Sequence, residues 1–252
     1  MVLRWLCFAL VWLLGSSVAQ ANKKDAAKLK RWKRLLKQGH ALADQRPYKV
    51  QIKGANKLWK AYQLYPKKWK SLEAGARASI IRASLAKTKR AISMWGKTGW
   101  HFGKLMVRMK PKRAEGYVWS SMMMGHYARA GNIWRAIKNG FGHRITNMAL
   151  ESLKRNRKLY KGAAQRVLGR YYYRVPWPWR SYKKSYVYLV EANKLAPKNV
   201  QGIRYLAETS WALGKKSKAR KLFRKCAKLW IPGLKPNSSS DRCRAWLKKN
   251  KR

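Results

Sequence analysis

The stretch that decides the fold is residues 199–231, NVQGIRYLAETSWALGKKSKARKLFRKCAKLWI. Its apolar residues recur at spacings of three and four, which is typical of helices with one buried face. Gly214 interrupts the pattern and predicts a turn between two helices. The first helix contains a large–small pair, Leu206-Ala207. The second helix carries a stripe of alternating small and large residues: Ala219, Phe223 and Cys226. Small residues let facing helices approach closely, so the stretch predicts an antiparallel helical hairpin.

The preceding segment repeats this pattern and ends at Pro197, because proline cannot continue a helix interior. Its first helix contains Leu168-Gly169. Its second helix carries the matching stripe: Ser185, Leu189 and Ala192. Residues 72–109 and 124–153 repeat the hairpin more loosely. Hairpins of about 34 residues in series are typical of tetratricopeptide (TPR) repeats. We therefore predict an all-α fold, a superhelix of stacked TPR-like helical hairpins. The alternative is an irregular helical bundle, because small–large spacing is common in helices.

The N-terminal residues are typical of an export signal. Arg4 supplies positive charge, residues 5–14 are apolar, and Ala19-Gln20-Ala21 is a cleavage site of the A-x-A type. The alternative is an uncleaved N-terminal anchor. We expect a periplasmic or secreted protein, cut after Ala21. The predicted parts are a signal peptide at 1–21, a basic N-terminal helical segment at 22–48, and the TPR-like domain with a C-terminal capping helix at 49–252.

Two of the three cysteines would remain after cleavage, because Cys7 lies in the signal segment. An even number of cysteines in an exported chain predicts a disulfide, here between Cys226 and Cys243. It would close a loop of about 18 residues, worth about 3 kcal/mol in the chain-entropy model. Two separate buried thiols are the alternative. The run from Ser238 to Asp241 offers N-caps for a last short helix, which the disulfide would attach to the final hairpin.

The charge balance excludes most catalytic chemistry. The chain has 61 Lys and Arg against 8 Asp and Glu, a net charge of +53, while 46% hydrophobic residues indicate a packed core. So few acids leave little material for carboxylate pairs or metal cages. Glu73 and Glu115 favour helix starts, and no pair of acids has catalytic spacing. The four histidines lack metal-ligand spacing. We predict no enzyme activity, no cofactor and no metal site.

Two further patterns concern anion binding. Residues 91–98, AISMWGKT, match a loose phosphate-binding loop, but a helix precedes them where the mechanism requires a buried strand. We interpret this segment as a turn between helices that uses Gly96 and Gly99. The basic residues are spread through nearly every predicted helix, so the sequence marks no single basic groove.

The segment 171–179, YYYRVPWPW, is unusual for a repeat protein. Two prolines stiffen a turn that presents two tryptophans. Such a turn can form the aromatic wall of a ligand site or a protein-binding hot spot. It can equally be a lid packed over the end of the helical stack.

Several motifs together resemble the T component associated with tripartite ATP-independent periplasmic (TRAP) transporters. They are EGYVW at 115–119, MGHYA at 124–128, LGRYY at 168–172 and VPWP at 175–178, within a resemblance that covers about residues 53–230. The resemblance implies an exported, all-helical protein of degenerate TPR-like hairpins that associates with a periplasmic solute-binding subunit. Members are often lipoproteins, whereas this signal segment does not end in cysteine.

The leading hypothesis is a non-enzymatic exported scaffold that binds a periplasmic solute-binding subunit or another envelope protein, and an apolar ligand. Homo-oligomers are a further option. The partner- or ligand-binding candidates are aromatic: Tyr117, Trp119, Tyr172, Trp177 and Trp179. The alternative is a basic envelope protein that binds polyanions, such as lipopolysaccharide, cell-wall polymer, an anionic membrane surface or nucleic acid. A general excess of basic residues in exported proteins of the source would also explain the charge.

Overall fold

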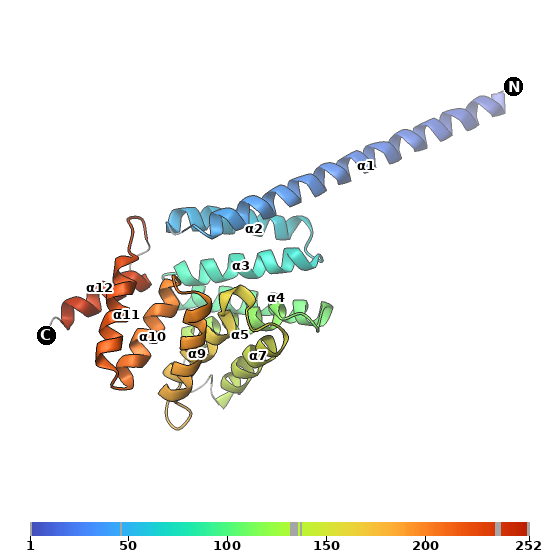
Figure 1. Cartoon of the computed structure of the whole chain (residues 1–252). Helices are drawn as coiled ribbons and strands as arrows, with labels where there is room; N and C mark the ends of the chain where they lie inside the picture. Colours follow the sequence, from blue (N-terminus) through green and yellow to red (C-terminus); the bar gives the residue numbers. More distant parts are fainter. Residues whose placement is uncertain (1, 46, 132–135, 137, 235–237, 251–252) are drawn as a thin grey trace.

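The computed structural model describes residues 2–45, 47–131, 136, 138–234 and 238–250, with side chains from residue 22 onward. Eleven α-helices and a short 3-10 helix, η1, follow one another in this part of the chain, and it contains no strand (Figure 1). The α-helices are α1 (Val2–Ala43), α2 (Tyr48–Leu64), α3 (Trp69–Leu85), α4 (Lys89–Met109), α5 (Glu115–Ala130), α7 (Phe141–Arg155), α8 (Ala163–Arg174), α9 (Tyr182–Leu195), α10 (Val200–Ala212), α11 (Lys216–Lys228) and α12 (Ser239–Lys249). The 3-10 helix is η1 (Leu159–Lys161).

Consecutive helices pack as antiparallel pairs that stack along the chain. The pairs are α1 with α2, α3 with α4, α5 with α7, α8 with α9, and α10 with α11, after which α12 packs on the last pair (Figure 1). The first helices of successive pairs also contact one another, α3 with α5, α5 with α8, and α8 with α10, and the last helix, α12, contacts α10 in the same row. We call these five the inner helices. The predicted all-α superhelix of stacked hairpins is confirmed.

The residues that defined the hairpins form its core. Leu206, Ala207 and the predicted α11 stripe are buried, and Gly214 makes the turn with a positive φ of 74°. In the preceding hairpin a Cβ on Gly169 would meet the Leu189 side chain at 2.4 Å, so the two helices touch at that glycine. Each hairpin therefore closes where a small residue faces a large one.

The contact between α4 and α5 shows that one prediction was wrong. Gly96 and Gly99 do not form a turn, because both lie inside α4, which begins at Lys89 with Thr88 as its N-cap. A Cβ on Gly96 would lie 2.7 Å from the backbone nitrogen of Tyr127, and one on Gly103 would lie 2.7 Å from that of Ser120. The glycines are on one face of α4 and let the α5 backbone approach. Their role is helix packing, and residues 91–98 form no phosphate-binding loop.

The N-terminal helix joins the stack through its second half. Trp32 is buried and its indole Nε1 donates to the Ser71 hydroxyl of α3 at 2.9 Å. The predicted signal peptide covers residues whose side chains lie outside the described part of the chain. The α1 helix continues through Ala21 without a break. Cleavage after Ala21 stays a prediction. None of the helices in the described part of the chain is both long and apolar enough to cross a bilayer.

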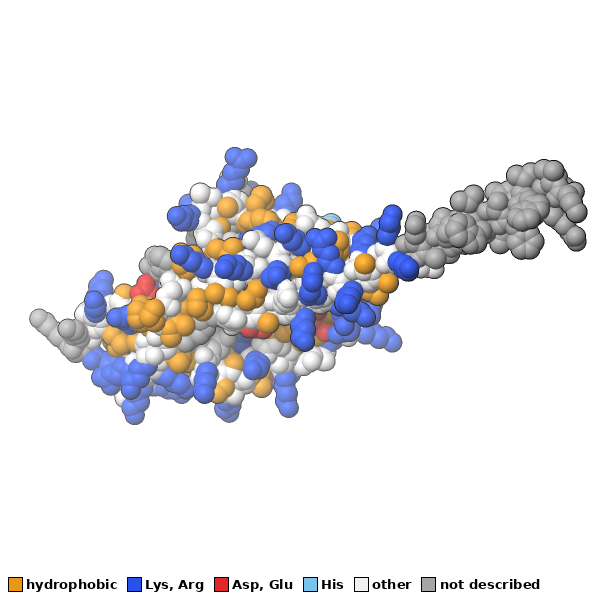
Figure 2. Space-filling model, turned by 90° about the horizontal axis from the view of Figure 1, so that it is seen from above, with side chains coloured by type: hydrophobic (Ala, Val, Ile, Leu, Met, Phe, Trp, Pro, Cys, Tyr) orange, Lys and Arg blue, Asp and Glu red, His pale blue; other side chains and the backbone are white. Residues whose placement is uncertain are grey.

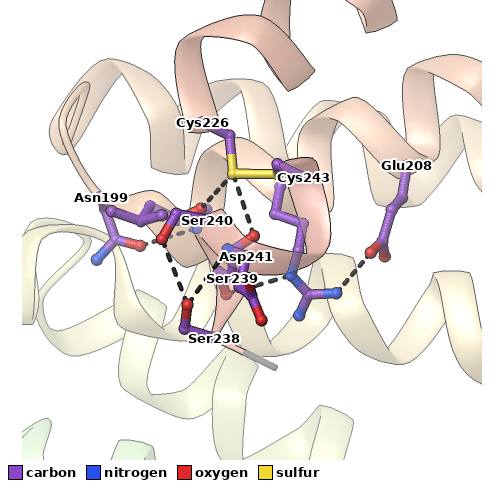
Figure 3. The surroundings of a disulfide bond; sticks show 11 residues. Asn199, Glu208, Cys226, Ser238, Ser239, Ser240, Asp241 and Cys243 are labelled. Carbon is purple, nitrogen blue, oxygen red and sulfur yellow. Dashed lines mark hydrogen bonds and ion pairs between the residues drawn. A yellow bond between two sulfur atoms is a disulfide. The ribbon is translucent and has the colours of Figure 1, made fainter. Parts of the chain in front are cut away.

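The C-terminal helix is fixed to the last hairpin (Figure 3). A disulfide joins Cys226 of α11 to Cys243 of α12, the predicted pair, with Cα atoms 6.0 Å apart and no solvent exposure. The Ser238 hydroxyl caps α12 by accepting from the Asp241 amide at 3.2 Å. The α12 helix is thereby held against the inner side of the stack.

Candidate interaction surface

Six arginines converge on one stretch of the inner helices. Three of them, Arg166, Arg170 and Arg174, lie on α8 at every fourth residue and therefore share one helix face. Arg129 comes from the end of α5, Arg204 from α10 and Arg242 from α12, and the charges of the α8 and α12 arginines act on Arg129. We call this set the inner arginine cluster: Arg129, Arg166, Arg170, Arg174, Arg204 and Arg242.

One carboxylate binds two members of the cluster. Arg170 donates to one oxygen of Glu208 and Arg204 to the other, each at 2.5 Å. Arg204 also donates to the Ser239 hydroxyl at 3.2 Å, which connects α10 to α12 (Figure 3). Its side chain is only 7% exposed, so Glu208 neutralises a guanidinium that has little contact with water.

Two tyrosines flank these groups. The Tyr205 ring lies under the guanidiniums of Arg170 and Arg204. Their Cζ atoms are 4.3 Å and 4.6 Å from the centroid of the ring. Arg170 also lies 5.1 Å from the ring of Tyr173. Arginines that stack on rings keep their planar donors directed outward at the ring edge, where an anion can reach them.

The cluster holds more positive charge than its contacts compensate. Arg129, Arg166 and Arg174 form no ion pair within the part of the chain that the structure describes. Partial burial lowers the pKa of Arg129, and the neighbouring guanidiniums act in the same direction. Burial also lowers the pKa of Arg204, and it lowers that of Arg166 to about 10. Guanidiniums that lie close together and repel one another favour the binding of an anion.

Arg166 links the cluster to the turn before α8. It donates to the backbone oxygens of Lys161 and Tyr160 at 2.6 Å and 3.1 Å. Tyr160, Lys161 and Gly162 all have positive φ, which is unusual for the two side-chain-bearing residues. The guanidinium therefore stabilises a strained turn.

That turn places Tyr160 between α3 and α5. The Tyr160 hydroxyl donates to the carboxylate of Glu73 and accepts from the indole Nε1 of Trp119 at 3.2 Å. Burial is the main cause that raises the pKa of Glu73, and the charge of Glu115 adds to it. Burial would raise the pKa of Glu115 as well, but its ion pair with Arg113 lowers it. The pKa values of these two neighbouring carboxyl groups are therefore shifted in opposite directions.

The structure separates the five aromatic residues predicted as binding candidates. Trp119 is buried under Tyr160. Tyr117 is buried too, and its hydroxyl donates to the Pro111 oxygen and accepts from Arg155, both at 3.0 Å. Tyr172 stacks on Tyr188 of α9. These three therefore hold helices together.

The other two predicted residues, Trp177 and Trp179, extend into solvent from residues 175–181, which we call the tryptophan loop. Their exposed fractions are 81% and 50%. The peptide bond between Trp177 and Pro178 is cis. The side chains at this tip are not packed over the helical stack.

A hollow lies elsewhere, between α7 and α9. It has a volume of about 480 Å³, and its wall combines three charged side chains, Glu151, Lys154 and Arg157, with apolar ones such as Leu150 and Leu153. Its wall contains none of the five predicted aromatic residues, although it includes Tyr188, on which Tyr172 stacks. No group of three or more His, Cys, Asp or Glu in the described residues could hold a metal ion.

The stacked helical pairs define a helical-repeat fold of the TPR-like type. The chain is similar to TTC0263, a thermophilic TPR protein of Thermus thermophilus, with a TM-score of 0.63 and 17% identity over 86% of this chain and 99% of that chain. The MamA protein is also similar, at a TM-score of 0.41 and 12% identity over 79% of this chain and 92% of its own. No family model and no curated protein matches the chain.

Sequence reasoning missed the inner arginine cluster because it counted lysine and arginine together. Lysine and arginine, taken together, are spread over the visible face of the molecule (Figure 2). Six of the arginines gather on the inner helices. The available signal was the spacing of Arg166, Arg170 and Arg174 on one helix. Which other helices face α8 there depends on the stacking, which the spacing does not encode.

Proposed function

We propose that this chain is a non-enzymatic exported scaffold that binds an acidic segment of a periplasmic partner protein on its inner helices. A solute-binding subunit is the partner that the resemblance to TRAP T components implies. The observation that carries the proposal is the inner arginine cluster, in which three guanidiniums have no ion-pair partner among the described residues.

The chemistry of the cluster suits a peptide carboxylate. Glu208 already binds two guanidiniums at once, one through each oxygen. This is the fork geometry by which arginine recognises carboxylates. A partner's Asp or Glu side chains would engage Arg129 and Arg174 in the same way, with Tyr173 and Tyr205 as flanking surfaces. Helical repeats commonly use such extended inner surfaces for polypeptide binding.

The test compares two double variants with equal changes in charge. Arg129→Gln/Arg174→Gln removes two guanidiniums that form no ion pair in the described chain. Lys225→Gln/Lys228→Gln removes two exposed charges from α11, an outer helix. We expect the arginine variant to bind a fluorescent Glu-rich peptide about tenfold more weakly than the parent, and the lysine variant to bind it almost as well. The measurement is fluorescence anisotropy at several salt concentrations.

A second experiment addresses the partner itself. Each form is expressed with its N-terminal segment, and the proteins that co-purify with it from the periplasm are identified by mass spectrometry. A solute-binding or other envelope protein should be recovered with the parent and the lysine variant, and lost with the arginine variant. Recovery of no partner contradicts the proposal. Equal loss of peptide binding in both variants, with a steep dependence on salt, indicates the polyanion alternative, in which total charge matters.

A further inference from the structure

The tryptophan loop is a feature that the scaffold function leaves unexplained. Trp177 is the most exposed large apolar side chain in the described part of the chain, at 81%, and Trp179 follows it at 50%. The loop projects beyond the helices at the lower edge of Figure 1, next to the start of α9. Exposing two neighbouring tryptophan rings to water is unfavourable in free energy, so such a site usually binds another molecule or a membrane.

The loop is ordered by its backbone, so these rings are held outward. Val175 is buried at its start. The Arg180 amide donates to the Pro176 oxygen and the Ser181 amide to the Tyr172 oxygen, both at 3.1 Å. The Arg180 guanidinium closes the loop by donating to the Val175 oxygen at 3.0 Å. The tryptophans thus need no rearrangement before they meet a binding surface.

The surroundings of the loop carry charge of one sign. The sequence contains no acidic residue between Glu151 and Glu191. Exposed basic side chains stand on both sides of the tryptophans, at Arg174 before the loop and at Lys183 and Lys184 after it.

The next hairpin adds to this basic edge. Its α10–α11 turn reaches the same region, because Lys215 and Lys218 lie 4.5 Å and 5.0 Å from the ring of Tyr186 on α9. The turn lies beside the tryptophan loop at the lower edge of Figure 1. The apolar tip is therefore surrounded by lysine and arginine contributed by two hairpins.

We propose that the tryptophan loop docks the protein on an anionic phospholipid surface. Tryptophan partitions to the level of lipid headgroups, where its ring is apolar and its N–H remains hydrated. Lysine and arginine around it attract anionic headgroups, and each adds to the affinity within a Debye length of the surface. The proposal shares only Arg174 with the inner arginine cluster, and its test leaves that residue unchanged.

A protein partner fits this tip less well than a bilayer. A stable protein interface covers about 800 Å² on each side, with apolar residues at its centre and polar groups of both signs at its rim. Here a narrow protrusion offers two rings, and the side chains around it are basic. Insertion into a bilayer needs no matching shape, so two rings on a protruding loop suffice to contribute.

The test is flotation of the full chain with vesicles of phosphatidylcholine alone or mixed with phosphatidylglycerol. The variant Trp177→Ala/Trp179→Ala is compared with Trp230→Ala, which removes a 39% exposed tryptophan from another part of the surface. We expect the loop variant to bind mixed vesicles about tenfold more weakly and the control to bind like the parent. The charge variant Lys183→Gln/Lys184→Gln should bind more weakly and show a smaller dependence on salt.

Residues 1–21 are present in every form and can bind lipid themselves. The lipid concentration is therefore set where half of the parent is bound, so that a loss of the loop's contribution is measurable. Circular dichroism verifies that each variant keeps its helices, as expected for exposed side chains. Brominated lipids should quench part of the parent's fluorescence, and this part should be absent from the loop variant. Equal flotation of the loop variant and the parent overturns the proposal, as does equal binding to neutral vesicles. If the loop variant instead loses a co-purifying protein and keeps its lipid binding, the tip is a protein contact.

Discussion

The Glu208 carboxylate allows the strongest test of the charge balance on the inner helices. The substitution Glu208→Gln keeps the shape of the side chain and removes its charge, leaving Arg170 and Arg204 without an anion. The side chains of Arg204, Glu208 and Arg170 are 7%, 21% and 23% exposed. Breaking a fully buried ion pair costs about 3–5 kcal/mol, and an exposed pair contributes about 0–1 kcal/mol.

For this site we expect a loss of about 2 kcal/mol in the free energy of unfolding, because burial is partial and the glutamine oxygen still accepts from one guanidinium. Urea unfolding followed by circular dichroism measures the loss as a lower midpoint at unchanged slope. The same variant should bind the Glu-rich peptide about fivefold more tightly, because a competing carboxylate is gone.

The matched control is Glu151→Gln. Glu151 also binds two basic side chains, Lys154 and Arg155, but at the solvent-exposed end of α7, where stability should hardly change. If Glu208→Gln and Glu151→Gln unfold at the same urea concentration, solvent screens the inner arginine cluster as well as it screens the surface. The reasoning about uncompensated charge would then be refuted.

Three further predictions concern the stack. Replacing Cys226 and Cys243 by alanine should lower the free energy of unfolding by about 3 kcal/mol, seen as a lower urea midpoint that a reducing agent no longer changes. Gly103→Ala should destabilise by about 1–3 kcal/mol, because its Cβ would meet the α5 backbone, whereas Gly125→Ala, with nothing within 4 Å, should stabilise by about 0.5–1 kcal/mol in thermal unfolding. The raised pKa of Glu73 means that the folded protein holds that proton more tightly than the unfolded chain, so stability should fall as pH rises from about 4.5 through the folded pKa. Glu73→Gln should reduce that loss in unfolding curves recorded at successive pH values, and an unchanged pH dependence would contradict the assignment.

The parts of the fold that depend on local pattern could be predicted from the sequence. The hairpin at residues 199–231, its turn at Gly214 and the Ser238 cap follow from spacing and turn chemistry along one segment. Gly96 and Gly99 show where local rules fail. Glycine indicates a turn by its own preferences, but here it allows another helix to approach.

The candidate site was harder to predict for the same reason. The inner arginine cluster takes its members from four helices, and only the three on α8 share a readable spacing. The aromatic motifs were conspicuous in sequence, yet Tyr117, Trp119 and Tyr172 hold helices together. A large aromatic residue fits a packed interior as well as a binding surface, so residue type alone does not separate the two roles.

The inner arginine cluster also has a mechanical consequence. Stacked hairpins contact only their neighbours, so the curvature of a helical repeat depends on small changes at each contact. Guanidiniums on α5, α8, α10 and α12 carry like charge across those contacts, and like charges repel one another. We expect salt or a bound anion to reduce this repulsion and to let the superhelix close. The pitch of the superhelix should then respond to ionic strength and to occupancy of the inner surface.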